Sequence, residues 1–199
     1  IANKVHNVVL ILTGRSALDE GKRAEIKKLE SLGARIAYKQ ADVTREQVVA
    51  DLIRGIEAEF GSLNGIIHSA GVIRDNRILQ KNSGEMLEVL APKVLGVVNL
   101  DQASKHLPLD FFILFSSVAG GLGNQGQADY STANAFMDAY ARYRSTLTGS
   151  QQRQGQTLSI NWPLWKEGGM HIDEETEKLV KQHTGMGSIS TSSGIQALY

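Results

Sequence analysis

Short apolar segments alternate with longer helical patterns along this chain, and this alternation constrains the fold more than any other feature. Five segments rich in β-branched, aliphatic or aromatic residues, bounded by Gly, Asp or Ser, predict strands. They cover residues 8–12, 34–38, 65–68, 111–115 and 157–161. Helical patterns lie between them at residues 20–32, 45–60, 83–106 and 127–147. Strands that alternate with helices build a parallel sheet between two helix layers, so we expect an α/β fold with a doubly wound sheet.

One unit of the usual dinucleotide-binding pattern is missing from the sequence. Such a fold begins with a strand, a glycine-rich turn and a helix whose N-terminus holds a pyrophosphate. No such fingerprint precedes the first predicted strand, and residues 1–7 resemble the end of the crossover helix that would follow it. We therefore expect residues 1–199 to form one Rossmann-like domain that lacks its first βα unit, because that piece was either cut away or not observed.

Composition limits the partners of the chain. Lys plus Arg and Asp plus Glu each total 21, so no net charge attracts it to nucleic acid or to an anionic membrane surface. The absence of cysteine excludes a disulfide framework and a cysteine-ligated metal, and agrees with a cytoplasmic location. The apolar segments are far shorter than the roughly 20 residues of a membrane span, and no signal peptide is visible. We predict no metal, nucleic-acid or membrane partner.

Polar residues follow the first two predicted strands and suggest a nucleotide site. Arg15 and Ser16 come after the first strand, where an acidic residue would bind the ribose hydroxyls of NAD. A guanidinium there suits the 2′-phosphate of NADP, and the alternative is a surface arginine in a turn. Asp42 and Val43 end the second strand, where the carboxylate would accept from an adenine amino group and the Val43 backbone would donate to the ring. The alternative for Asp42 is the N-cap of the following helix.

The third predicted strand runs into small residues. Ser69, Ala70 and Gly71 would let the backbone approach a flat ring, and a tight turn explains them equally well. We interpret His68 as a packed core histidine rather than a catalyst, because no neighbour in the sequence would tune its pKa.

Four polar residues carry the predicted chemistry. Ser117 closes a strand, Tyr130 begins the next helix thirteen residues later, and Asn134 lies one helical turn beyond it on the same face. Carbonyl reduction needs an acid that protonates the developing alkoxide, and a phenol with a pKa of about 10 is too weak without a nearby cation. Lys93 would be that cation and would donate to the nicotinamide ribose, while Ser117 would donate to the carbonyl oxygen of the substrate.

The residues around Tyr130 read GQADYSTANAF and resemble the short-chain dehydrogenase/reductase superfamily, specifically the ketoreductase domains of modular polyketide synthases. Classical members carry lysine four residues after the tyrosine. Ketoreductases of polyketide and animal-type fatty acid synthases have asparagine there and take lysine from an earlier helix, as in this pair of Asn134 and Lys93. The contexts at 91–96, 115–120 and 161–165 are also similar to that family, and residues 162–170 most resemble synthases whose acyltransferase acts in trans.

The resemblance implies NADPH-dependent reduction of a β-ketoacyl thioester to the β-hydroxyacyl thioester. The substrate would be carried by phosphopantetheine on an acyl carrier protein, and the other domains of the same synthase would be further partners. It also implies a lid at about 166–187, within which residues 173–183 form an amphipathic helix after a glycine pair. A plain surface helix is the alternative for that segment.

A stereochemical class follows from the same resemblance. B-type ketoreductases, which give the D-hydroxyl, carry aspartate three residues after the valine of the Ala-Gly-Val turn, and Asp75 lies there. A-type members carry tryptophan where this chain has Leu122. We therefore expect the B-type, with Asp75, Leu122 and Met170 near the substrate, although residues 73 and 74 differ from the usual Leu-Asp.

Two other functions remain open at this point. An inactive, scaffolding domain is opposed by the four intact residues Lys93, Ser117, Tyr130 and Asn134, although the missing glycine-rich unit keeps it open. A free-standing dehydrogenase is opposed by Asn134, which stands where its lysine should be.

Overall fold

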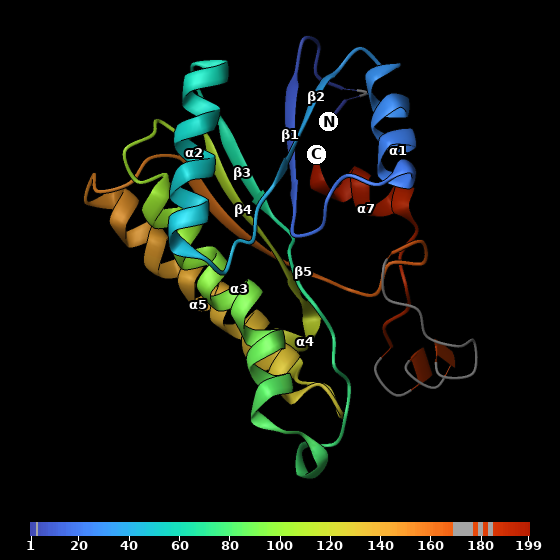
Figure 1. The fold of residues 1–199 in the computed structure, drawn as a ribbon. Helices are drawn as coiled ribbons and strands as arrows, with labels where there is room; N and C mark the ends of the chain where they lie inside the picture. Colours follow the sequence, from blue (N-terminus) through green and yellow to red (C-terminus); the bar gives the residue numbers. More distant parts are fainter. Residues whose placement is uncertain (3, 169–176, 179–180, 183–184) are drawn as a thin grey trace.

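All five predicted strands are present and parallel, but they form two sheets. The computed structural model describes residues 1–2, 4–168, 177–178, 181–182 and 185–199 (Figure 1). The first sheet pairs β1 with β2, and the second has the order β3-β4-β5. The α/β class with parallel strands is therefore confirmed, and the strand ends lie within two residues of the prediction. The strands are β1 (Val9–Gly14), β2 (Arg35–Gln40), β3 (Gly65–His68), β4 (Phe111–Ser117) and β5 (Gln156–Trp162).

The four predicted helices connect these strands in the expected order. They are α1 (Glu20–Glu30), α2 (Glu46–Phe60), α3 (Ser83–Ala103) and α5 (Ala128–Gly149). The sequence patterns did not predict three shorter elements: η1 (Ile78–Gln80), α4 (Val118–Leu122) and α7 (Thr191–Leu198). In Figure 1, α2, α3 and α5 lie on one side of the strands, and α1 and α7 lie on the other.

Side chains near the helix ends explain where two of these helices begin. Asp19 accepts a hydrogen bond from the Lys22 backbone N–H and caps α1. Asn82 and Glu85 bond each other's backbone N–H groups in a capping box that starts α3.

The described residues of the segment 1–7 make one turn of the kind that ends a helix. Among the described residues of this segment, the Lys4 and Val5 N–H groups both donate to the Ile1 carbonyl, at 2.8 and 3.0 Å, which makes a single turn. Asn7 then adopts a left-handed conformation with φ of 57°. A helix commonly ends in a residue with this left-handed conformation, so the turn agrees with the predicted helix end.

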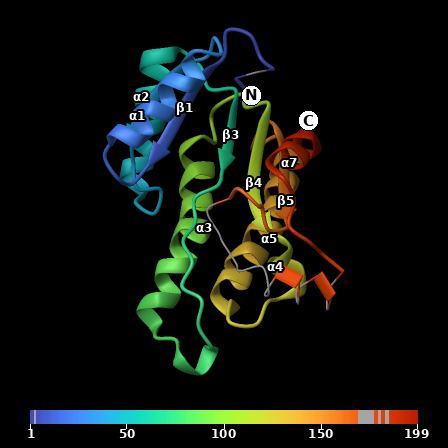
Figure 2. The same cartoon turned by 90° about the vertical axis from the view of Figure 1, so that its right-hand side faces the viewer.

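The core lies between the second sheet and the helices on one of its faces. Alternate residues of β3 and β4, among them Ile66, Phe112 and Leu114, are buried against α2, α3 and α5. Their neighbours Ile67 and Ile113 point to the opposite face and are only half-buried. Figure 2 shows β1 standing apart from β3, so the facing edges of these two strands have no ladder partner in the described part of the chain.

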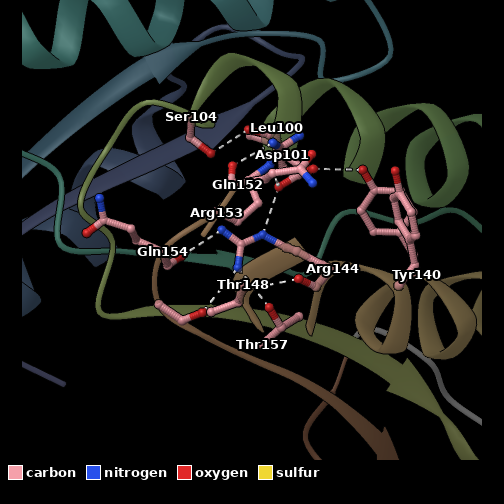
Figure 3. A network of polar contacts seen from close by, with 12 residues as sticks. Leu100, Asp101, Ser104, Tyr140, Arg144, Thr148, Gln152, Arg153, Gln154 and Thr157 are labelled. Atoms are coloured by element: carbon pink, nitrogen blue, oxygen red, sulfur yellow. Dashed lines mark hydrogen bonds and ion pairs between the residues drawn. The ribbon is translucent and has the colours of Figure 1, made fainter. Parts of the chain in front are cut away.

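A buried polar network holds α3 against α5 (Figure 3). Asp101 on α3 accepts hydrogen bonds from Tyr140 Oη at 2.9 Å and Arg144 Nε at 2.8 Å on α5, and from Arg153 Nε at 2.9 Å in the loop before β5. Arg144 also donates to the Gln154 and Gly155 carbonyls and to the Thr157 hydroxyl. The network therefore fixes the two helices that carry Lys93 and Tyr130 to each other and to the start of β5.

Candidate active site

The structure brings the four predicted catalytic side chains to the carboxyl end of β4. Lys93 projects from the middle of α3, and its Nζ lies 5.6 Å from the centroid of the Tyr130 ring. Ser117 is the last residue of β4, while Tyr130 and Asn134 share one face of α5. The side chains of Ser117 and Asn134 lie close enough to the Tyr130 phenol to lower its pKa against the effect of burial. One cluster of a cation, a phenol, a hydroxyl and an amide results.

Lys93 is held by backbone rather than by a carboxylate. It is only 4% exposed, and its Nζ donates to the Phe115 carbonyl at 3.1 Å. Burial lowers the pKa of Lys93 to about 8, and the charge of Asp138 acts in the opposite direction. The amine therefore stays mostly charged at neutral pH while remaining sensitive to its surroundings.

The surroundings of Tyr130 keep its phenol protonated. Burial raises the pKa of its phenol, and the side chains of Ser117 and Asn134 limit this increase. A raised pKa keeps the phenol protonated at neutral pH, which is the state that a reductive proton transfer requires. Asn134 also donates from Nδ2 to the Tyr130 carbonyl at 2.8 Å, and its Oδ1 is a buried acceptor without a partner among the described residues.

Gly71 makes room for Lys93. A Cβ at Gly71 would lie 3.1 Å from Lys93 Cε and 3.6 Å from its Nζ, so a larger residue would crowd the lysine side chain. Residues 69–71 form no assigned turn, so the tight-turn alternative lacks support. This contact has no local signature in the sequence, because the two residues lie on separate elements.

A cavity of about 420 Å³ opens between β1 and β3 and extends along their carboxyl ends. Six of the predicted cofactor residues line it, whereas Ser16, Lys93 and Tyr130 do not. The six are Arg15, Asp42, Val43, Ser69, Ala70 and Gly71. The Ser16 side chain is exposed and accepts from Lys22 Nζ, and the Ser16 carbonyl accepts from the Tyr38 hydroxyl.

Asp42 is not a helix cap. The N-cap of α2 is Arg45, and Asp42 instead accepts hydrogen bonds at Oδ1 from the Thr44 N–H and hydroxyl, at 3.0 and 2.8 Å. The N-cap alternative is therefore wrong, because Asp42 stands three residues too early and closes a local turn instead. Burial alone would raise the pKa of Asp42, but the bonds from Thr44 and the charges of Arg15 and Arg45 lower it overall. The carboxylate consequently remains charged at the cavity wall.

The loop that carries Asp75 is fastened to the start of α5. Asp75 Oδ2 accepts from Gln127 Nε2 at 2.8 Å, close to Tyr130 in the chain. The fully buried Lys81 and Asp129 form an ion pair at 2.6 Å. Sequence reasoning missed Gln127, Lys81 and Asp129 because their pairing joins segments about 50 residues apart.

The remaining predicted substrate residues are less informative. Leu122 is 72% exposed at the end of α4, and Met170 lies outside the described residues. Most of the expected lid, and most of its expected helix at 173–183, also lies outside them.

The two described ends of the expected lid segment are joined to each other. The Lys166 N–H donates to the Ile189 carbonyl at 2.9 Å, and the Ile189 N–H donates to the Leu164 carbonyl at 2.8 Å. Glu167 accepts from the Thr191 N–H, at the start of α7.

In the described part of the chain, no group of three or more metal-ligating side chains occurs, and no helix combines the length and apolar character needed to cross a membrane.

A parallel α/β fold with lysine, tyrosine, serine and asparagine gathered at a strand end defines a reductase of the short-chain dehydrogenase/reductase class. The KR domain family matches residues 3–167. The chain is 54% identical to polyketide synthase PksN and 53% identical to PksL of Bacillus subtilis (strain 168), over 199 residues in each case. The chain therefore belongs to the KR domain family, the ketoreductase domains of polyketide synthases.

Solved structures agree with this assignment. The crystal structure of a ketoreductase domain from the bacillaene assembly line matches with a TM-score of 0.96 and 50% identity, covering 100% of this chain and 48% of that one. An N-terminal ketoreductase from the macrolactin assembly line matches with a TM-score of 0.88 and 42% identity, covering 99% and 37%. The chain thus spans about half of the bacillaene domain, and 4% of PksN and PksL. Domains of this family reduce a β-keto group with a nicotinamide cofactor.

Proposed function

We propose that the domain containing this chain reduces a β-ketoacyl thioester to a β-hydroxyacyl thioester with NADPH. The observation that carries the proposal is the convergence of Lys93, Ser117, Tyr130 and Asn134 at the end of β4. All four side chains are present, whereas an inactive, scaffolding domain could have lost one of them. The family assignment supports a polyketide intermediate as the substrate.

The polar residues at the carboxyl-end rim of the cavity fit a phosphorylated dinucleotide, whereas its apolar interior is the gap between β1 and β3 that a further strand would occupy. Arg15 and Asp42 line its wall and lie near enough for the guanidinium charge to lower the pKa of Asp42. Arg15 would pair with the 2′-phosphate, Asp42 with the adenine amino group, and the backbone at Ser69–Gly71 with the nicotinamide half. Bound there, the cofactor supplies a hydride to the substrate carbonyl carbon.

The chain's own residues would complete the reduction by moving one proton. Ser117 donates a hydrogen bond to the substrate carbonyl oxygen and orients it toward Tyr130. The Tyr130 hydroxyl gives its proton to that oxygen as the carbon–oxygen double bond becomes single. The Lys93 ammonium would stabilise the phenolate left on Tyr130. The buried Oδ1 of Asn134 has no partner among the described residues and would be free to accept a hydrogen bond as the phenol regains its proton.

Replacing Tyr130 with Phe tests this assignment. In the complete domain, Tyr130→Phe should lower kcat for a β-ketoacyl thioester by at least about 100-fold, because it removes the proton donor. NADPH binding, followed by fluorescence, should change little. Turnover is measured from NADPH absorbance. Retained turnover would remove Tyr130 as the acid, and a wild-type domain that binds NADPH without oxidising it would favour the scaffolding function.

The gap between β1 and β3 suggests where the missing βα unit lies. In the usual doubly wound order the first strand stands between the second and the fourth, and β1 and β3 correspond to those two. A further parallel strand there would pair with both open edges and join the two sheets into one. We expect amide hydrogen exchange in β1 and β3 to slow when the unit is present.

Stereochemistry and partners follow as further parts of the proposal. The hydrogen bond from Gln127 holds Asp75 against the start of α5, where its charge reaches Tyr130, and this supports a B-type reduction giving the D-hydroxyl. An acyl carrier protein with a phosphopantetheine arm would deliver the substrate, in a cytoplasmic synthase whose acyltransferase acts in trans. Chiral analysis of the product distinguishes B-type from A-type reduction, and the lid at 166–187 remains a prediction.

A further inference from the structure

His68 joins the end of β3 to the middle of α3. Its side chain is buried, with 3% exposure, and its Nε2 lies 3.0 Å from the Pro92 carbonyl oxygen. A carbonyl only accepts hydrogen bonds, so Nε2 carries the proton and donates it. Pro92 immediately precedes Lys93 in α3. The bond therefore reaches the backbone next to the residue that carries the ammonium.

The helix approaches His68 closely because Gly96 has no side chain. A Cβ at Gly96 would lie 3.1 Å from His68 Cε1 and 3.0 Å from Val43 Cγ2, tighter than ordinary contacts. Gly96 faces the sheet edge less than one turn beyond Lys93. The close packing at Gly96 and the hydrogen bond to the Pro92 carbonyl thus both hold the turn of α3 that carries Lys93.

Pro92 makes this turn dependent on an outside anchor. Proline has no N–H, so the helix loses one backbone bond here, between residue 92 and the carbonyl of residue 88. A turn that lacks one of its own bonds is more easily displaced than a regular one. The bond from His68 replaces part of the lost restraint on the side that faces the sheet.

We propose that His68 is a positioning residue for Lys93. By holding the Pro92 carbonyl, it sets the place of the ammonium between the Phe115 carbonyl and the Tyr130 ring. This inference rests on the proposed reductase function, since Lys93 matters as the partner of Tyr130.

The charges around His68 are consistent with this role. Burial and the charge of Lys93 lower the pKa of His68 to about 4, so the imidazole is neutral at working pH. Three side chains surround Lys93. His68 approaches it from β3, and Asp138 and Tyr130 approach it from α5. A neutral donor holds the helix without adding a second positive charge next to the ammonium.

Two variants of equal length separate the hydrogen bond from the packing. The Gln amide can replace the Nε2 donor, whereas the Met thioether fills similar space and cannot donate. In the complete domain, His68→Met should lower kcat for a β-ketoacyl thioester by roughly 10- to 100-fold, because small misplacements of catalytic groups have effects of that size. His68→Gln should stay within about threefold of wild type.

A second readout does not depend on turnover. Crystal structures of both variants should show the Lys93 Nζ still bonded to the Phe115 carbonyl in His68→Gln and displaced from it in His68→Met. Tyr140→Phe is the stability control, because it also removes a bond to α3 but acts two turns away at Asp101. It should leave kcat within about twofold of wild type despite its lower stability.

The outcomes separate this inference from the proposed function. If wild type oxidises NADPH while His68→Met and His68→Gln match each other in kcat and in Lys93 position, the positioning role is refuted. If wild type does not oxidise NADPH, the proposed function fails, and the crystallographic comparison alone then supports or refutes the anchoring of Lys93 by His68.

Discussion

Asp101→Asn should destabilise the fold by about 3–5 kcal/mol, because it removes the charge that two buried arginines share. Asp101 is completely buried, and Arg144 and Arg153 are 1% and 8% exposed. The asparagine keeps the size of the side chain and one acceptor oxygen, so the change isolates the charge. Arg144 would then remain buried with only carbonyl and hydroxyl acceptors, and Arg153 with the Gln152 carbonyl. Tyr140 would also lose the carboxylate acceptor of its hydroxyl proton.

This loss is a large part of the stability of a typical domain, which is about 5–15 kcal/mol. Urea unfolding of the complete domain measures it. With a slope of roughly 2 kcal/mol per molar urea, the midpoint should fall by about 1.5–2.5 M. The fluorescence of Trp162 and Trp165 follows the transition. Trp162 ends β5, the strand whose first residues contact the network, and Trp165 packs against Trp162.

An exposed pair provides the control. Asp51 and Arg54 form an ion pair whose side chains are 58% and 66% exposed. Asp51→Asn should change the free energy of unfolding by less than about 1 kcal/mol, because solvent screens exposed pairs. If Asp101→Asn also costs less than 1 kcal/mol, the carbonyl acceptors of Arg144 solvate the buried charge by themselves, and the argument from the shared carboxylate is refuted.

Two further predictions concern the cofactor and pH. Arg15→Asp should weaken NADPH binding at least about 10-fold while changing NADH binding far less, because an attractive guanidinium–phosphate pair would become a repulsive carboxylate–phosphate pair. Titration with each cofactor measures the two affinities. Equal losses for both cofactors would contradict the assignment of Arg15 to the 2′-phosphate. Stability should also fall as pH drops from 6.5 toward 4, because the unfolded state protonates His68 in that range while burial and the Lys93 charge keep it neutral in the folded state. The expected slope is about 1.4 kcal/mol per pH unit. His68→Gln should lose that part of the slope in denaturant unfolding at pH 7, 6 and 5, and an unchanged slope would contradict the low pKa.

The sequence determined the elements of this fold through its local patterns. Apolar runs and helical periodicity placed the five strands and the four main helices, because a side chain's face depends on its position within its own element. Local spacing likewise brought Tyr130 and Asn134 together, since residues four apart share a helix face. These features depend on a few neighbouring residues, so the sequence carried them directly.

Other features depended on contacts between distant segments. Strand patterns do not specify neighbours, so the division into two sheets was visible only in the structure. For Asp42 the sequence left an adenine contact and a helix cap open, and only the structure excluded the cap, because its Oδ1 accepts from Thr44 in a local turn. His68 was correctly interpreted as buried, but its partner, the Pro92 carbonyl, is a backbone atom with no signature in the sequence.

The buried network at Asp101 illustrates the general limit. Its members come from α3, α5 and the loop before β5, and each alone is an ordinary charged residue. The sequence decided which groups were available to hydrogen-bond. The tertiary structure decided which of them met, because a buried polar group is stable only where packing brings it a partner, and that partner can lie anywhere along the chain.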